Sequence, residues 1–81
     1  MSDDIIMDII EVLDELHGDS TVPRNVKIKI SVIISTLKEN IDVQVRINKA
    51  LNELDEICDD ANIQAFTRTQ LWNVATMLEK V

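Results

Sequence analysis

The sequence predicts an all-α fold, a four-helix antiparallel bundle built from two helix hairpins. Along most of the 81 residues, apolar side chains recur every three to four positions, as in amphipathic helices with one buried face. Short polar segments separate these stretches, and short connections favour antiparallel neighbours. The second half also resembles the first half at an offset of 41 residues.

Matched positions define this offset. Leu-Asp-Glu-Leu at 13–16 returns as Leu-Asp-Glu-Ile at 54–57. The other matched pairs are Asp19 and Asp60, Val22 and Ile63, Lys27 and Arg68, Ile30 and Leu71, Ile33 and Val74, and Leu37 and Leu78. A period of about 40 residues is typical of a repeated helix pair. We therefore expect one domain over residues 1–81, with repeat one over about 3–39 and repeat two over about 41–81. Two stacked hairpins are the alternative, but they would make a very short solenoid.

The first helix is expected over residues 3–17. Its two adjoining apolar rows contain Ile5, Ile9, Val12 and Leu16, and Ile6, Ile10 and Leu13. Ser2 or Asp3 is expected to cap the first turn, where carboxylates also favour the positive end of the helix dipole. Gly18 is expected to end the helix in the left-handed conformation that glycine adopts most easily.

The second helix is expected to begin with Pro23, because the missing N–H of proline would have no intrahelical partner at the first helical position. Its apolar row contains Val26, Ile30, Ile33 and Leu37. Residues 27–32 alternate between polar and β-branched side chains, which is also typical of a half-buried strand. Helix is favoured because the apolar row continues beyond this segment and the second repeat lacks the alternation.

The third helix follows a link at 38–40, with Asn40 as its expected cap, and the fourth follows a second turn at 59–62. Trp72 of the fourth helix is expected to be partly buried at the edge of the core. The residues expected in the core are Ile9, Leu13, Leu16, Ile30, Ile33, Leu37, Leu51, Leu54, Leu71, Val74 and Leu78. Those expected to be among the most deeply buried are Leu13, Ile30, Leu51 and Val74.

Composition and charge limit the class of protein. A single cysteine excludes an intramolecular disulfide framework and fits a reducing compartment. No apolar run approaches the roughly 18 residues of a membrane span, and the acidic N-terminus is unlike a signal peptide. We therefore expect a cytoplasmic protein without a membrane association.

The net charge of −7 is unevenly distributed along the chain. Residues 1–19 carry −7, residues 20–49 carry +4, residues 50–60 carry −5 and residues 61–81 carry +1. An acidic chain as a whole repels nucleic acid, whose binding depends largely on neutralising phosphates. No nucleic acid partner is expected, and the basic middle is interpreted as balancing the acidic blocks within the fold.

The first and third helices of an up-down bundle end where the second and fourth begin, so acidic residues gather at that end. Asp19, Asp59 and Asp60 are the candidate ligands there for a hard cation such as Ca²⁺ or Mg²⁺. The favoured interpretation is that these aspartates cap the following helices. Neither a bound metal nor a cofactor is therefore expected.

His17 and Cys58 occupy equivalent positions of the two repeats, and a histidine near a cysteine resembles a base and a nucleophile. No Gly-rich oxyanion loop or third catalytic residue accompanies them. The favoured roles are a cation at a helix C-terminus for His17 and a buried or half-buried structural thiol for Cys58. No catalytic residue is predicted, and the chain is not expected to be an enzyme.

Four residues near the helix starts, Pro23, Arg24, Asn25 and Arg68, are expected to pin the turns. Arg24 would pair with an aspartate of either turn, and Asn25 would bond the turn backbone. Arg68 would need a carboxylate partner, because a basic residue at a helix N-terminus opposes the helix dipole. Ligand binding by these residues is the alternative.

The second helix has more apolar residues than the core requires. Ile28 and Val32 lie one turn apart on a face about 160–200° from Ile30, whereas the second repeat has a threonine and an asparagine at the equivalent positions. Lys27 and Lys29 flank them and would meet acidic residues of a second copy. Scattered surface isoleucines are also normal. We interpret the two apolar residues and the two lysines, Ile28, Val32, Lys27 and Lys29, as a candidate interface for a homodimer or a protein partner.

Two motifs resemble those of a known family. Thr-Val-Pro-Arg-Asn-Val at 21–26 and Thr-Arg-Thr-Gln-Leu-Trp-Asn at 67–73 are similar to the motifs of small archaeal proteins known as uncharacterised protein family 0147. The similarity spans nearly the whole chain, although members often have a proline where this chain has Gln64 and Ala65. The resemblance implies an all-helical bundle in an archaeal cytoplasm and implies no activity.

The sequence therefore leads to two hypotheses about function. The first is a non-enzymatic interaction or scaffold module that self-associates through the second helix. The second is a small domain that binds a ligand or a divalent metal at its acidic end.

Overall fold

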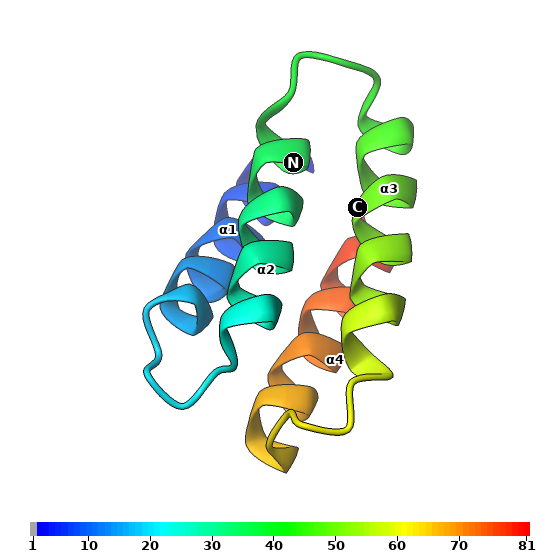
Figure 1. The fold of residues 1–81 in the computed structure, drawn as a ribbon. Coiled ribbons are helices and arrows are strands. Elements are labelled where there is room, and N and C mark those ends of the chain that lie inside the picture. The colour runs from blue at the N-terminus through cyan, green and yellow to red at the C-terminus, as the bar shows by residue number, and fades with distance from the viewer. Residues whose placement is uncertain (1) are drawn as a thin grey trace.

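The structure is a computed structural model that describes residues 2–81 and the side chains of residues 4–81. Its four helices are α1 (Ser2–His17), α2 (Arg24–Lys38), α3 (Val43–Cys58) and α4 (Ala65–Glu79). They run alternately in opposite directions, with the turns before α2 and α4 at one end and the α2–α3 link at the other (Figure 1). The all-α bundle predicted from the sequence is confirmed, and residues 27–32 are helical.

The helices form a closed ring. Among the described residues, α1 packs against α2, α2 against α3, α3 against α4 and α4 against α1, while no Cα atoms of the diagonal pairs come within 8 Å of each other. The contact between α1 and α4 closes the ring, which a stacked pair of hairpins would leave open. The resulting bundle measures 32 × 18 × 17 Å. None of the described helices is long and apolar enough to cross a membrane.

The two halves have the same local geometry. Each helix of the second half begins and ends 41 residues after its counterpart in the first half. The turn hydrogen bonds also match, because the N–H of Asp19 donates to the carbonyl of Leu16 at 3.1 Å and that of Asp60 to the carbonyl of Ile57 at 3.0 Å. An internal repeat of the sequence itself stays a prediction.

The centre of the ring is filled by aliphatic side chains. All the predicted core residues except Leu51 are at most 4% exposed. Leu51 is only partly buried, so its prediction as one of the deepest residues is wrong. The neighbouring Ala50 is fully buried, and the rotation of about 100° between consecutive helical residues turns Leu51 towards the edge of the core.

Some core residues were not expected from the helical pattern. Val22 and Ile63 extend the core from the two turns, and they are 4% and 5% exposed. Thr36 and Thr67 are buried although they are polar. The Oγ1 of Thr67 has no hydrogen-bond partner among the described residues.

The end of α1 differs from the prediction for Gly18. No described residue has a positive φ, so Gly18 does not adopt the left-handed conformation. Its N–H instead donates to the carbonyl of Asp14 at 3.1 Å, which continues the right-handed turn. A Cβ atom at this position would meet only ordinary contacts, 3.7 Å from two carbonyl oxygens.

The starts of α2 and α3 are also displaced from their predicted positions. Pro23 is the N-cap of α2, with φ −58° and ψ 149°, and the helix begins at the next residue. Asp42, and not Asn40, caps α3, because its Oδ1 accepts a hydrogen bond of 2.8 Å from the N–H of Gln44. The predicted capping of α1 concerns the side chains of Ser2 and Asp3, which lie outside the described residues.

Arg46 connects α3 to the end of α2. Its Nη1 donates to the carbonyl of Leu37 at 2.9 Å in a partly buried position. This carbonyl belongs to the last turn of α2, where carbonyls lack intrahelical partners and a positive charge is favourable. The bond therefore fastens the end of the bundle that contains the link.

The two leucines of α3 test the core assignment. Leu54→Ala should lower the free energy of unfolding by about 2–5 kcal/mol, because it leaves a cavity at a fully buried site. Leu51→Ala should lower it by less, since Leu51 is already partly exposed. Urea unfolding followed by circular dichroism measures both. Equal losses for the two variants would contradict the position of Leu51 at the margin of the core.

Thr67 offers a stabilising substitution. Thr67→Val keeps the shape of the side chain and removes a buried hydroxyl that has no partner, so it should raise the free energy of unfolding by about 1 kcal/mol. Val26 occupies the equivalent position of α2 and is equally buried. The matched control, Val26→Thr, should change stability in the opposite direction. A loss of stability in Thr67→Val would show that its hydroxyl is satisfied.

Candidate functional site

Asp19 and Asp60 organise the two turns at the same end of the bundle. The Oδ1 of Asp19 accepts hydrogen bonds from the N–H of Thr21 at 2.8 Å and from its hydroxyl at 2.7 Å. The Oδ1 of Asp60 accepts from the N–H of Asn62 at 2.8 Å. In both turns an aspartate bonds the backbone two residues ahead, which is a local geometry that aspartate favours.

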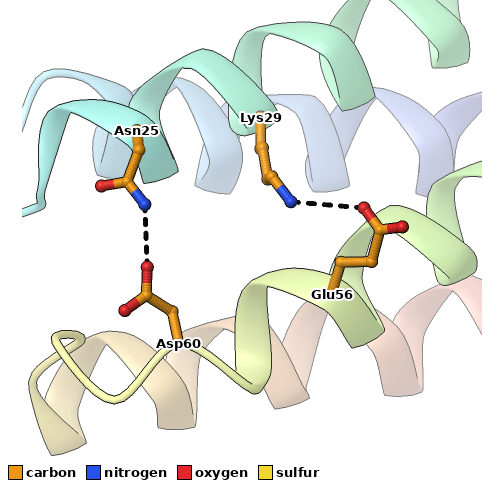
Figure 2. A network of polar contacts seen from close by, with 4 residues as sticks. All are labelled: Asn25, Lys29, Glu56 and Asp60. Carbon is orange, nitrogen blue, oxygen red and sulfur yellow. Dashed lines mark hydrogen bonds and ion pairs between the residues drawn. The ribbon is translucent and has the colours of Figure 1, made fainter.

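Asp60 also connects its turn to α2. Its Oδ2 accepts a hydrogen bond of 2.8 Å from Nδ2 of Asn25, and one helical turn further on Nζ of Lys29 lies 3.3 Å from Oε2 of Glu56 (Figure 2). We call these four residues the polar clasp. Arg68 of α4 holds the same turn, because its Nη2 donates to the carbonyl of Asp60 at 3.1 Å. The polar clasp therefore joins α2 to the end of α3.

The surroundings of Asp60 lower the pKa of its carboxyl from 3.8. The hydrogen bond from the N–H of Asn62 has the largest effect, followed by that from the side chain of Asn25, and two nearby basic residues act in the same direction. The pKa of Asp19 is lowered as well, first by the N–H and then by the hydroxyl of Thr21. Both carboxyls are thus held in the ionised form that the turns require.

The turn-pinning residues have partners other than those predicted. Arg24 is exposed, and its side chain makes no hydrogen bond or ion pair among the described residues, so its predicted pairing with an aspartate is wrong. Asn25 bonds a carboxylate across the bundle and not the turn backbone. Arg68 donates to the carbonyl of Asp60, which also accepts from the N–H of Ile63, where a carboxylate partner was expected. Pro23 lies at the N-cap position of α2 and makes no side-chain capping bond.

The acidic end of the bundle does not gather the candidate metal ligands. The described residues contain no group of three His, Cys, Asp or Glu side chains that could hold a metal ion. Asp19 and Asp60 each direct oxygen atoms at the N–H groups of their own turns. Asp59 is exposed at the C-cap of α3. The geometry therefore gives the cation hypothesis no support.

His17 and Cys58 have different neighbours. They end α1 and α3, which are diagonal helices whose Cα atoms do not come within 8 Å of each other among the described residues. Cys58 is half-buried, as predicted, and burial followed by the negative charge of Asp55 raises the pKa of its thiol, although Arg68 opposes this. A raised pKa keeps the sulfur in its less nucleophilic thiol form at neutral pH.

His17 instead lines a shallow, open groove between α1 and α2. The groove has a volume of about 210 Å³, and its other lining residues are Asp14, Ser31, Ile34 and Ser35. Trp72 lies at the position of α4 that is equivalent to Ser31, and it is 56% exposed. The prediction that Trp72 is partly buried at the edge of the core is therefore wrong: its ring lies mostly outside the aliphatic cluster.

The outer face of α2 exposes the two apolar residues that the sequence singled out. Ile28 is 60% exposed and Val32 is 45% exposed. The flanking Lys27 and Lys29 are half-buried, and Lys29 already pairs with Glu56 of its own chain. Lys29 is thus engaged within the bundle, whereas the two apolar side chains have no cover among the described residues. We call Ile28 and Val32 the α2 pair.

Acid titration tests the polar clasp. The folded pKa of Asp60 is depressed, so its stabilising contribution is complete above the unfolded value of 3.8 and is lost as pH falls through the folded value. Asp60→Ala should therefore unfold at a lower urea concentration than wild type at neutral pH, and this difference should vanish in strong acid. Asp59→Ala, at an exposed neighbouring position, is the control. A difference that persists in strong acid would contradict the role of the carboxylate.

Comparison with known proteins gives consistent matches over the full length. The model of a family described as "Uncharacterised protein family (UPF0147)" matches residues 1–81. A UPF0147 protein of Methanocaldococcus jannaschii is 38% identical over 80 residues, which cover 98% of this chain and 86% of the relative. A UPF0147 protein of Archaeoglobus fulgidus is 34% identical over 74 residues, which cover 91% of this chain and 85% of the relative.

Two crystal structures have the same fold. One, of a protein of unknown function, has a TM-score of 0.94 and 33% identity, and the match covers 100% of this chain and 93% of the other. The second, of a UPF0147 protein from Thermoplasma acidophilum, has a TM-score of 0.91 and 32% identity, covering 96% and 93%. Because the family model spans the chain and its relatives share the bundle, this protein belongs to the uncharacterised protein family UPF0147, as its two motifs predicted.

Proposed function

We propose that this protein is a non-enzymatic interaction module that self-associates through the outer face of α2. The observation that carries the proposal is the exposure of the α2 pair, Ile28 at 60% and Val32 at 45%. Two β-branched side chains one turn apart form a continuous apolar ridge on a helix surface. Water is excluded from such a ridge when a second protein surface covers it.

The equivalent face of α4 supports this interpretation. Thr69 and Asn73 occupy the positions equivalent to Ile28 and Val32, and both are exposed. The bundle therefore accommodates polar residues at these positions without loss of its core. The apolar character of the α2 pair is a property of the surface of α2 and not a requirement of packing within the ring.

A second copy is the proposed occupant because one segment of the chain is acidic and another is basic. The N-terminal residues 1–19 carry −7, while residues 20–49, which include α2, carry +4. A second copy thus brings its own acidic residues to the basic surroundings of the α2 pair. Attraction of this kind favours encounter and orientation more than it adds affinity.

Light scattering across a concentration series tests the proposal. Wild type should exceed the monomer mass of 9.2 kDa as its concentration rises from micromolar to millimolar. Ile28→Lys/Val32→Glu should weaken association more than about a hundredfold, because association would then bury unpaired charges. The matched control, Thr69→Lys/Asn73→Glu, makes the same chemical change on α4 and should associate as wild type does.

Circular dichroism of all three proteins shows whether the helices are retained. If wild type stays at the monomer mass over the whole range, self-association is wrong. The same conclusion follows if the α2 and α4 variants lose association equally, since the surface would then not be specific to α2.

A further inference from the structure

We propose that the second copy packs its α2 antiparallel to the first α2, about a twofold axis beside residues 30–32, with Arg24 of each copy paired with Glu39 of the other. This inference rests on the proposed self-association and specifies its geometry. In a twofold contact, each residue pair occurs twice with the roles of the copies exchanged. The surface must therefore be complementary to itself.

Five exposed residues of α2 and its C-cap lie along one stripe. They are Arg24, Ile28, Val32, Ser35 and Glu39, at spacings of i, i+4, i+8, i+11 and i+15. At about 100° per residue these positions fall within a sector of about 80°. The stripe has a positive charge at its beginning, the α2 pair and a small serine in its middle, and a negative charge at its end.

An antiparallel partner makes this stripe self-complementary. When the second α2 runs in the opposite direction, its negative end lies beside the positive end of the first α2. Its positive end then lies beside the negative end of the first α2. When the axis passes beside residue 30, Ile28 lies opposite the other copy's Val32. Arg24 and the other copy's Glu39 are then offset by about 4.5 Å along the helix axis, a distance that these long side chains span. A parallel arrangement would instead place like charges together.

The helix dipole favours the same orientation. Arg24 lies in the first turn of α2 and Glu39 at its C-cap, so each charge is at the end of its own helix where it is unfavourable. In the antiparallel pair, each Arg24 approaches the negative C-terminal end of the partner helix. Each Glu39 approaches the positive N-terminal end. Both unfavourable placements within one chain become favourable between two chains.

Neither charge is engaged within the chain. The side chains of Arg24 and Glu39 are exposed and make no hydrogen bond or ion pair among the described residues. The nearby Lys29 and Asn25, by contrast, belong to the polar clasp. Ser35 is small and lines the groove beside the stripe, so a second helix can approach closely there.

Charge reversal with mixing tests the geometry. Arg24→Glu and Glu39→Lys should each weaken self-association about tenfold, because each variant places like charges together at both ends of the contact. A mixture of the two variants should associate as wild type does, since each end then has one Glu and one Lys, or one Arg and one Glu. The double variant Arg24→Glu/Glu39→Lys should also associate as wild type does.

Unfolding does not explain such a loss. Arg24→Glu puts an acid in the first turn of α2, and Glu39→Lys puts a base at its end, so both changes suit the helix dipole. Each variant should keep the helical circular dichroism spectrum and, at a concentration where wild type is monomeric, should unfold at or above the wild-type temperature. The mixing experiment is done at low salt, where exposed ion pairs are least screened.

The outcomes separate this inference from the function on which it rests. Restored association in the mixture supports the antiparallel pairing. A different result is that wild type associates and Ile28→Lys/Val32→Glu abolishes association, but the charge reversals have no effect or the mixture does not regain association. The antiparallel geometry is then wrong, while self-association through the outer face of α2 is still supported. If wild type is monomeric throughout, or associates only with a different protein, both proposals fail.

Discussion

Each helix of this protein has one apolar stripe that faces the centre of the ring, and the other helices cover it. The side chains that fill the ring are Ile, Leu, Val and Ala with two threonines, and neither Phe66 nor Trp72 is among them. Aliphatic side chains of this size must interdigitate closely, because none is large enough to bridge a gap alone. The antiparallel order, the short connections and the buried turn residues Val22 and Ile63 all follow from closing this one cluster.

Periodicity predicted the parts of the fold that depend on many residues at once. The helical rows identified the four helices and nearly all the core, because burial repeats along each row. Single positions were harder to predict. Leu51 has the same apolar character as Leu54, and only the packing of Ala50 into the ring decides which of the two leucines faces inwards.

The candidate site shows the same distinction. Pattern and spacing placed Asn25 and Arg68 near the turns, and both contact Asp60 there. Their acceptor atoms depend on distances between elements that are remote in sequence, so the sequence could not supply them. Asn40 and Asp42 are both good capping residues, and the choice between them depends on where the link leaves α2. Gly18 was assigned a conformation that glycine permits but this turn does not use.

The two halves share their backbone but differ on their surfaces. Asn25 of the polar clasp corresponds to Phe66, which has an apolar ring and no donor for an aspartate. Ser31, beside the groove, corresponds to Trp72, and the α2 pair corresponds to a threonine and an asparagine. Core positions are constrained by their neighbours on all sides, whereas outward positions are not. Any recognition by this bundle is therefore expected to distinguish α2 from α4.

The contact between α1 and α4 has a further consequence for the order in which the helices can be connected. Because α1 and α4 pack side by side in opposite directions, the start of α1 lies next to the end of α4. Both lie at the end of the bundle that also contains the α2–α3 link (Figure 1). The start of α1 and the end of α4 thus lie next to each other, as the ends of α2 and α3 that the 39–42 link joins do on the opposite side of the ring. A short peptide from the end of α4 to the start of α1, together with an opening in the 39–42 link, would yield the order α3, α4, α1, α2 with each neighbouring pair of helices retained. A chain joined in this order would keep all four helix contacts of the ring.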